Sequence, residues 1–259
     1  MASLNETLQR LAVQVKATPQ ELISYAAEDT LGGYHWNPAM ATFPMGSCYG
    51  VEGQTLYALI RFLKPFTVVE IGGLAGCGTS HLAAACKANG FGEVISVDNG
   101  VLGGVHGELI PAHLRPYVTL VQANGEDWLA EQDDQSIGLV FEDATHGTPL
   151  VAQLSRLALR KLQPGGILAN HDAGHDQAVV GGGQIVSSLV GREVRDGLAQ
   201  ANAYFSVYLA EPSDCGLAIT VAPGEWQPAE LDSGMQGVGI APIESAAPVK
   251  KTRQRKAKV

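Results

Sequence analysis

FTVVEIGGLAGCGTS, residues 66–80, is the stretch that decides how the chain folds. It begins with a short apolar run, Phe66 to Val69, passes through Glu70, and then places four glycines in seven positions. An alanine-rich helical pattern, HLAAACKANG, follows at once. This order predicts a buried strand, a tight turn and the start of a helix. Glycines allow positive φ and close approach of a ligand, and first-turn N–H groups are free, so we expect a ligand site at the end of a parallel strand.

Two common glycine-rich motifs do not fit this stretch. A dinucleotide fingerprint that starts at Gly76 and Gly78 needs a third glycine, but His81 occupies that position. A Walker-A motif from Gly73 to Gly78 needs a lysine next, and Thr79 stands there instead. The turn is therefore expected to bind a nucleotide-type ligand of another kind.

The pattern E-I-G-x-x-x-G-x-G-T resembles motif I of the class I S-adenosylmethionine (SAM) methyltransferases. In that family a second acidic residue ends the next strand, and Asp98 does so here after the apolar run Val94 to Val97. A carboxylate at that place can accept hydrogen bonds from both ribose hydroxyls. An ordinary α/β turn with a capping acid remains the alternative. The resemblance implies that SAM is bound by Glu70, Gly72, Gly73, Gly76, Gly78, Ser80, Asp98, Asn99, Glu126, Asp127, Trp128 and Asp143.

The adenine end of that set follows a third expected strand, residues 118–122, which leads into ANGEDWL. In the resembling family a polar or acidic side chain near this point meets the adenine amino group, and its neighbours cover the ring. Asn124, Glu126, Asp127 and Trp128 are the local candidates. Asp127 can equally be interpreted as the N-cap of the helix that follows.

A second block of sequence resembles a subgroup of this family, the sugar and macrolide O-methyltransferases. A fourth expected strand, residues 137–141, ends in EDATH, and after a helix and a PGG turn a fifth, residues 167–169, ends in NHD. The subgroup pattern, F-I-D-x-D-H-S-Y and then L-K-P-G-G-x-I-x-x-H-D-Y, places its aspartate on Asp143, its histidine on His146 and its H-D pair on His171 and Asp172. Three departures from the pattern, at Thr145, at Thr148 with Pro149, and at Ala173, leave the substrate open.

The resemblance and the chemistry of these side chains suggest catalytic roles. Asp143 and Asp172, at the ends of neighbouring strands, suit a hard cation such as Mg²⁺, which could orient a substrate hydroxyl. His171 or His146 could take the hydroxyl proton as general base, with Asp143 as the third catalytic residue. Alternatively, Asp143 orients the cofactor or caps the next helix, and His146 is an ordinary helix-start histidine.

The expected architecture is an α/β, Rossmann-like methyltransferase sheet of five parallel strands plus a C-terminal antiparallel hairpin, with helices on both faces. YFSVYLA and GLAITVA supply the hairpin. We expect residues 1–49 to form two helices and a lid-like loop, residues 50–223 the SAM-binding domain, and residues 224–259 a tail with a basic end.

Length, composition and cysteine content limit the fold class and the cellular compartment that the sequence allows. The 259 residues are 46% hydrophobic and 17% charged, which suits one α/β domain with extensions. The N-terminus has no signal-peptide pattern and no run is long enough to span a membrane, so a cytoplasmic protein is expected. The four scattered cysteines favour neither a zinc site nor a disulfide framework.

Charge is unevenly spread along the chain. The last ten residues hold six of the 17 basic side chains, which leaves 11 basic against 26 acidic residues in the rest. Such a body is not expected to bind nucleic acid. The tail alone could contact RNA, DNA or an acidic partner, but a flexible, disordered tail that aids solubility is the favoured interpretation. The leading interpretation is an O-methyltransferase that acts on a small hydroxylated molecule. Such an enzyme could also form a homo-oligomer. A nucleic-acid or protein methyltransferase docked by the tail and a non-catalytic SAM-fold protein remain alternatives.

Overall fold

A computed structural model describes residues 4–31, 50–144, 148–171, 204–207, 217–222 and 224–226. The elements are α1 (Leu4–Val15), α2 (Pro19–Glu28), α3 (Gly50–Leu63), β1 (Thr67–Ile71), α4 (Cys77–Asn89), β2 (Glu93–Asp98), η1 (Arg115–Tyr117), β3 (Val118–Gln122), α5 (Gly125–Ala130), β4 (Ile137–Glu142), α6 (Thr148–Lys161), β5 (Leu162–Asn170), β6 (Tyr204–Val207) and β7 (Leu217–Val221).

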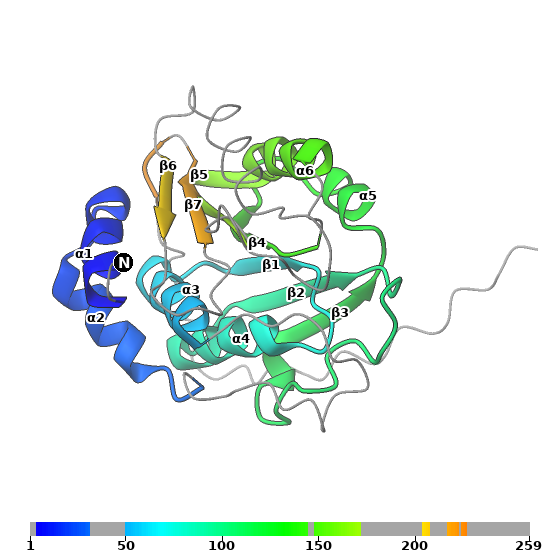
Figure 1. The fold of residues 1–259 in the computed structure, drawn as a ribbon, viewed down its shortest axis with the longest axis horizontal. Coiled ribbons are helices and arrows are strands. Elements are labelled where there is room, and N and C mark those ends of the chain that lie inside the picture. Colours follow the sequence, from blue (N-terminus) through cyan, green and yellow to red (C-terminus); the bar gives the residue numbers. More distant parts are fainter. Residues whose placement is uncertain are drawn as a thin grey trace, which may run out of the picture.

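One seven-stranded sheet organises the chain, in the order β3-β2-β1-β4-β5-β7-β6 (Figure 1). Strands β1 to β5 pair in parallel, and β7 joins β5 and β6 in antiparallel fashion. The predicted five parallel strands and closing hairpin are confirmed. The order reverses between β1 and β4, and ligands of open α/β sheets bind at such a switch point, beyond the carboxyl ends of the strands.

The PGG segment departs from the prediction. It was expected to be a turn before a short fifth strand, but Pro164, Gly165 and Gly166 lie inside β5. The pairing of β4 with β5 shifts register between Ile137 and Leu139, as it does at a bulge. Gly165 has φ +74°, and a Cβ there would lie 2.4 Å from the backbone nitrogen of Trp226. The bulge thus lets residues from the start of the predicted tail pack against the sheet.

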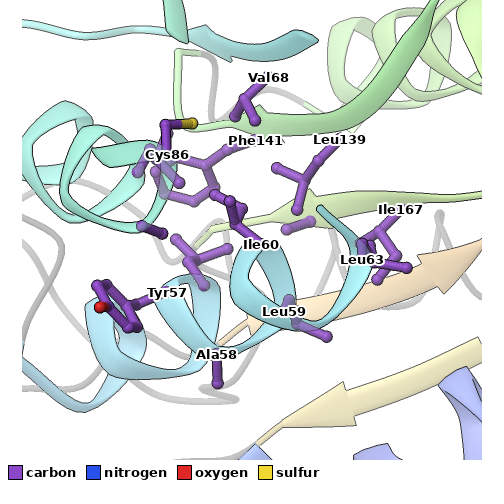
Figure 2. Packing of buried hydrophobic residues seen from close by; sticks show 14 of the residues in the cluster. Tyr57, Ala58, Leu59, Ile60, Leu63, Val68, Cys86, Leu139, Phe141 and Ile167 are labelled. Atoms are coloured by element: carbon purple, nitrogen blue, oxygen red, sulfur yellow. The ribbon is translucent and has the colours of Figure 1, made fainter. Parts of the chain in front are cut away.

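Two apolar layers flank the sheet because successive strand residues point to opposite faces. Figure 2 shows Leu59, Ile60 and Leu63 of α3 packed against side chains of β4 and β5, Leu139, Phe141 and Ile167 among them. The other face carries α5 and α6, whose buried side chains meet the alternate residues of the same strands. This sandwich holds the strand ends at fixed places.

The N-terminal helices share the core of the α3–α4 face. Leu8 and Leu11 of α1 and Leu22 of α2 are fully buried in the same cluster as α3 and α4. Asp29, which follows α2, places Oδ2 2.6 Å from Nδ1 of His81 in α4, and both side chains are almost completely buried. A buried carboxylate–imidazole contact therefore links this region to the first turns of the helix after the glycine-rich turn.

Among the described helices, none combines the length and the apolar character that a bilayer span requires.

Candidate active site

The glycine-rich turn crosses from β1 between the ends of two neighbouring strands. The Gly72 nitrogen donates to the carbonyl of Val97 near the end of β2, over 2.8 Å, and the backbone nitrogen of Asp143 donates to the carbonyl of Ile71, also over 2.8 Å. Gly72 has φ +94°, and a Cβ on it would lie 2.5 Å from the Asp143 carbonyl oxygen. Only glycine fits, so the turn passes very close to the residue predicted to face the substrate.

Asp98 holds Leu74, two residues further along the turn, in an uncommon conformation. Leu74 has φ +41°, which an L-residue with a side chain rarely adopts. Its nitrogen donates to Oδ2 of Asp98 over 3.0 Å, and its carbonyl accepts from the Gly107 nitrogen over 2.8 Å. Oδ1 of Asp98 accepts from the Gly100 nitrogen over 2.7 Å. Local strain maintained by surrounding bonds is frequent where a ligand is clamped, and the half-buried Asp98 carboxylate keeps lone pairs for one.

Glu70 lies beneath the turn in a buried polar cluster. Its Oε2 accepts hydrogen bonds from the hydroxyls of Thr79 and Ser96, the latter over 2.6 Å, and Ser96 Oγ lies 3.1 Å from His106 Nε2. Burial raises the pKa of Glu70 to about 7, against the lowering effect of the Ser96 and Thr79 hydrogen bonds. Burial also lowers the pKa of His106. An acid poised near neutrality is typical of functional sites.

The other predicted SAM-binding residues surround these two acids. Asn99 is exposed, and its Oδ1 accepts from the Val101 nitrogen over 2.9 Å. Ser80 is buried, and its hydroxyl donates to the Gly76 carbonyl over 2.6 Å. Gly76 is the N-cap of α4 with φ +93°, and Gly78 lies buried inside that helix.

The predicted adenine-side residues lie in α5. Its N-cap is Asn124, whose Oδ1 accepts from the nitrogens of Glu126 and Asp127, so the interpretation of Asp127 as the cap was wrong. Glu126 and Asp127 are exposed and Trp128 is half-buried. A Cβ on Gly125 would lie 2.2 Å from Cγ2 of Ile71, which places the start of α5 against the end of β1 and therefore beside the turn.

Asp143 and His171, predicted to face the substrate, are close together. Nδ1 of His171 lies 2.9 Å from Oδ1 of Asp143, and its Nε2 lies 3.0 Å from Oε2 of Glu52 in α3. Glu52 is not among the residues predicted from the sequence. A signal was present, because Glu52 lies four residues before Leu56 and seven before Leu59, on the apolar stripe of its helix, where a carboxylate needs a partner.

His146, Asp172 and the loop 32–49 lie outside the described residues, so their predicted roles stay predictions. Across the ranges that the structure does describe, no three His, Cys, Asp or Glu side chains are arranged to hold a metal ion. Of the two predicted metal ligands, Asp143 and Asp172, the structure therefore describes only Asp143.

Comparisons with known proteins fit this geometry. Residues 69–173 match a family model described as a methyltransferase domain. No curated protein matches the chain in sequence.

Several solved structures share the fold. A methyltransferase from Geobacter sulfurreducens is 18% identical, with a TM-score of 0.50, and 83% of this chain and 96% of that chain are covered. The O-methyltransferase TomG from Streptomyces achromogenes, involved in tomaymycin synthesis and solved with SAM, is 18% identical, with a TM-score of 0.53 and 79% and 90% covered. Cofactor-bound Rv0187 from MTB is 16% identical, with a TM-score of 0.54 and 87% and 100% covered. Residues 69–173 thus match a methyltransferase domain, and the chain shares the fold of these solved methyltransferases.

Proposed function

We propose that the protein transfers the methyl group of SAM to a hydroxyl oxygen of a small molecule. The observation that carries the proposal is the turn of residues 72–76, held in a strained conformation by Asp98 within a domain that matches methyltransferases. Asp98 is the expected partner of the ribose hydroxyls, and Glu70 lies beneath the turn, where the methionine part of SAM is expected. The solved neighbours that bind SAM or are named O-methyltransferases support this choice.

SAM supplies a methyl group already activated by a positively charged sulfonium. The chain therefore needs to align the acceptor oxygen and remove its proton. Asp143 and His171 lie at the carboxyl ends of β4 and β5, beside Gly72, where an acceptor would meet the methyl group. We assign His171 as the general base, with the Asp143 carboxylate orienting the hydroxyl.

Isothermal titration with SAM and with S-adenosylhomocysteine tests the cofactor site. Asp98→Ala removes the expected ribose acceptor and frees Leu74 from its strained conformation, so we expect SAM affinity to fall about 100-fold, in line with the loss of two charged hydrogen bonds. Asp133→Ala, which removes an exposed aspartate from another loop, serves as control and should bind like the wild type. If the wild type binds neither compound, the non-catalytic alternative takes the lead.

A divalent cation is a further part of the proposal. Carboxylate oxygens are the ligands that Mg²⁺ prefers, and the Asp143 side chain is 19% exposed and so open to an ion. We expect Mg²⁺ titrated into the wild type to bind, and to bind at least about 10-fold more weakly to Asp143→Ala, because one ligand is lost. Equal binding to both proteins would remove Asp143 from the metal site and leave it the role of orienting the hydroxyl.

A further inference from the structure

The imidazole of His171 lies between two carboxylates that come from distant parts of the chain. Nε2 lies 3.0 Å from Oε2 of Glu52, 119 residues earlier, and Nδ1 lies 2.9 Å from Oδ1 of Asp143. The side chains are 0% exposed for Glu52, 6% for His171 and 19% for Asp143. The ring therefore has an inner side, facing α3, and an outer side, facing the ends of the strands.

The inner carboxylate stands where the helix pattern calls for an apolar residue. Glu52 is in the first turn of α3, and the stripe that continues from it through Leu56 and Leu59 is buried in the core. Burying a carboxylate is unfavourable unless strong hydrogen bonds replace its water. An imidazole N–H is such a donor, and its bond to an ionised oxygen is stronger than one between neutral groups. A leucine would fill this position without that cost, so the carboxylate serves its polar contacts, and one of these is the 3.0 Å contact with His171.

We propose that Glu52 is a positioning residue: its carboxylate accepts a hydrogen bond from Nε2–H of His171 and so fixes the ring with Nδ1 turned outward, beside Asp143. This inference deepens the proposed function and rests on it for the place of the acceptor. The bond made by one ring nitrogen sets the state of the other. With Nε2 committed to Glu52, Nδ1 is the nitrogen left to take the proton of an acceptor hydroxyl, which has to replace the Asp143 carboxylate as the neighbour of that nitrogen. The proton passes from the hydroxyl to Nδ1, and the imidazolium formed lies between the carboxylates of Glu52 and Asp143.

The inference is tested on the whole protein labelled with ¹⁵N-histidine, through long-range ¹H–¹⁵N correlations that report which ring nitrogen carries a proton. His171→Gln identifies the signals of His171 by their loss. In the wild type we expect a protonated Nε2 with a downfield, slowly exchanging proton. In Glu52→Leu that proton signal should disappear and the nitrogen pattern should change, because the acceptor is gone.

Two further variants test whether a change in the His171 signals comes from the loss of the Glu52 acceptor. Glu52→Gln keeps the size and one acceptor oxygen, so it should retain a protonated Nε2 with a weaker bond, seen as an upfield shift of its proton. It decides the question if Glu52→Leu does not fold, since removing one member of a buried pair can be strongly destabilising. Asp29→Asn is the matched control, because Asp29 and His81 form another buried carboxylate–imidazole pair. It should alter the signals of His81 and leave those of His171 unchanged.

Unchanged His171 signals in Glu52→Leu and Glu52→Gln would overturn the proposed role of Glu52, and so would a wild type with an unprotonated Nε2. Titration with SAM keeps this result separate from the proposed function. Glu52→Gln should bind SAM within about 2-fold of the wild type, because the acids assigned to the cofactor, Glu70 and Asp98, are untouched. A wild type that fails to bind SAM would count against the methyltransferase function, while the spectra would still decide whether Glu52 positions the ring.

Discussion

An alanine at position 72 is expected to lower the free energy of unfolding by about 2 to 6 kcal/mol and to abolish detectable SAM binding. A positive φ in a residue that carries a Cβ costs about 1 to 3 kcal/mol, and overpacking costs a similar amount, so the two costs together give this range. Gly72 has φ +94°, and its Cβ would lie 2.5 Å from the Asp143 carbonyl oxygen and 2.7 Å from Cα of Ala144. Both neighbours are backbone atoms, so no side chain can rotate out of the way.

Urea unfolding followed by circular dichroism, together with titration by SAM, measures the two parts of this expectation. Gly90→Ala is the matched control. Gly90 also has a positive φ, +78°, at the end of α4, but nothing lies within 4 Å of a Cβ placed there. It should lose only about 1 kcal/mol, the cost of the conformation itself, and keep its affinity for SAM. If Gly72→Ala behaves like Gly90→Ala, the close crossing between the turn and the end of β4 does not constrain the site.

The comparison of these two glycines shows what sequence can and cannot supply. Four glycines after a short apolar run predict a turn, and the strand-end acids Glu70, Asp98 and Asp143 follow from counting along apolar runs. These signals are local, and the sheet confirms all five parallel strands. Whether a Cβ at a given glycine would contact backbone atoms or only open space depends on how strands that are distant in the sequence pack together. That information is absent from any short window of sequence.

The same limit explains the parts of the site that were missed. Glu52 meets His171 because α3 packs on the face of the sheet with its first turn beside the carboxyl end of β5, and nothing near either residue in the sequence specifies that packing. Ser96 meets Glu70 because it is the register partner of Glu70 on the neighbouring strand β2, and His106, from the loop after β2, reaches Ser96. Asn124 rather than Asp127 caps α5, which is a shift of three residues, and helix boundaries are the least certain part of a sequence prediction. Periodicity locates the elements, whereas tertiary packing selects the partners.

Glu70→Gln is expected to stabilise the protein at pH 8 by about 3 kcal/mol and to have little effect at pH 4.5. Burial raises the pKa of Glu70 from 4.5 to about 7, and each unit corresponds to about 1.4 kcal/mol. A raised pKa means that the folded state binds the proton more tightly than the unfolded state. The resulting stability is fully present below pH 4.5, declines as the pH rises, and is lost above pH 7. Glutamine keeps an acceptor for Ser96 and Thr79 but never ionises, so it avoids this loss.

Urea unfolding of both proteins between pH 4.5 and 8 gives the difference directly, with Glu131→Gln as control for removing one charge from an exposed position. A difference that does not grow between pH 4.5 and 7 would show that Glu70 ionises as easily in the folded as in the unfolded state.

Ionising Glu70 destabilises the protein, and a role for its carboxylate in binding SAM would explain why a glutamate occupies this buried position. SAM carries positive charges on its ammonium and sulfonium groups, and an opposite charge nearby favours the ionised carboxylate. Binding of SAM should therefore release a proton from Glu70, and wild-type affinity should rise with pH until about pH 7. Glu70→Gln should bind SAM more weakly and with no such rise. A wild-type affinity that is flat across this range would assign Glu70 to the support of the turn through Thr79 and Ser96, and not to the cofactor.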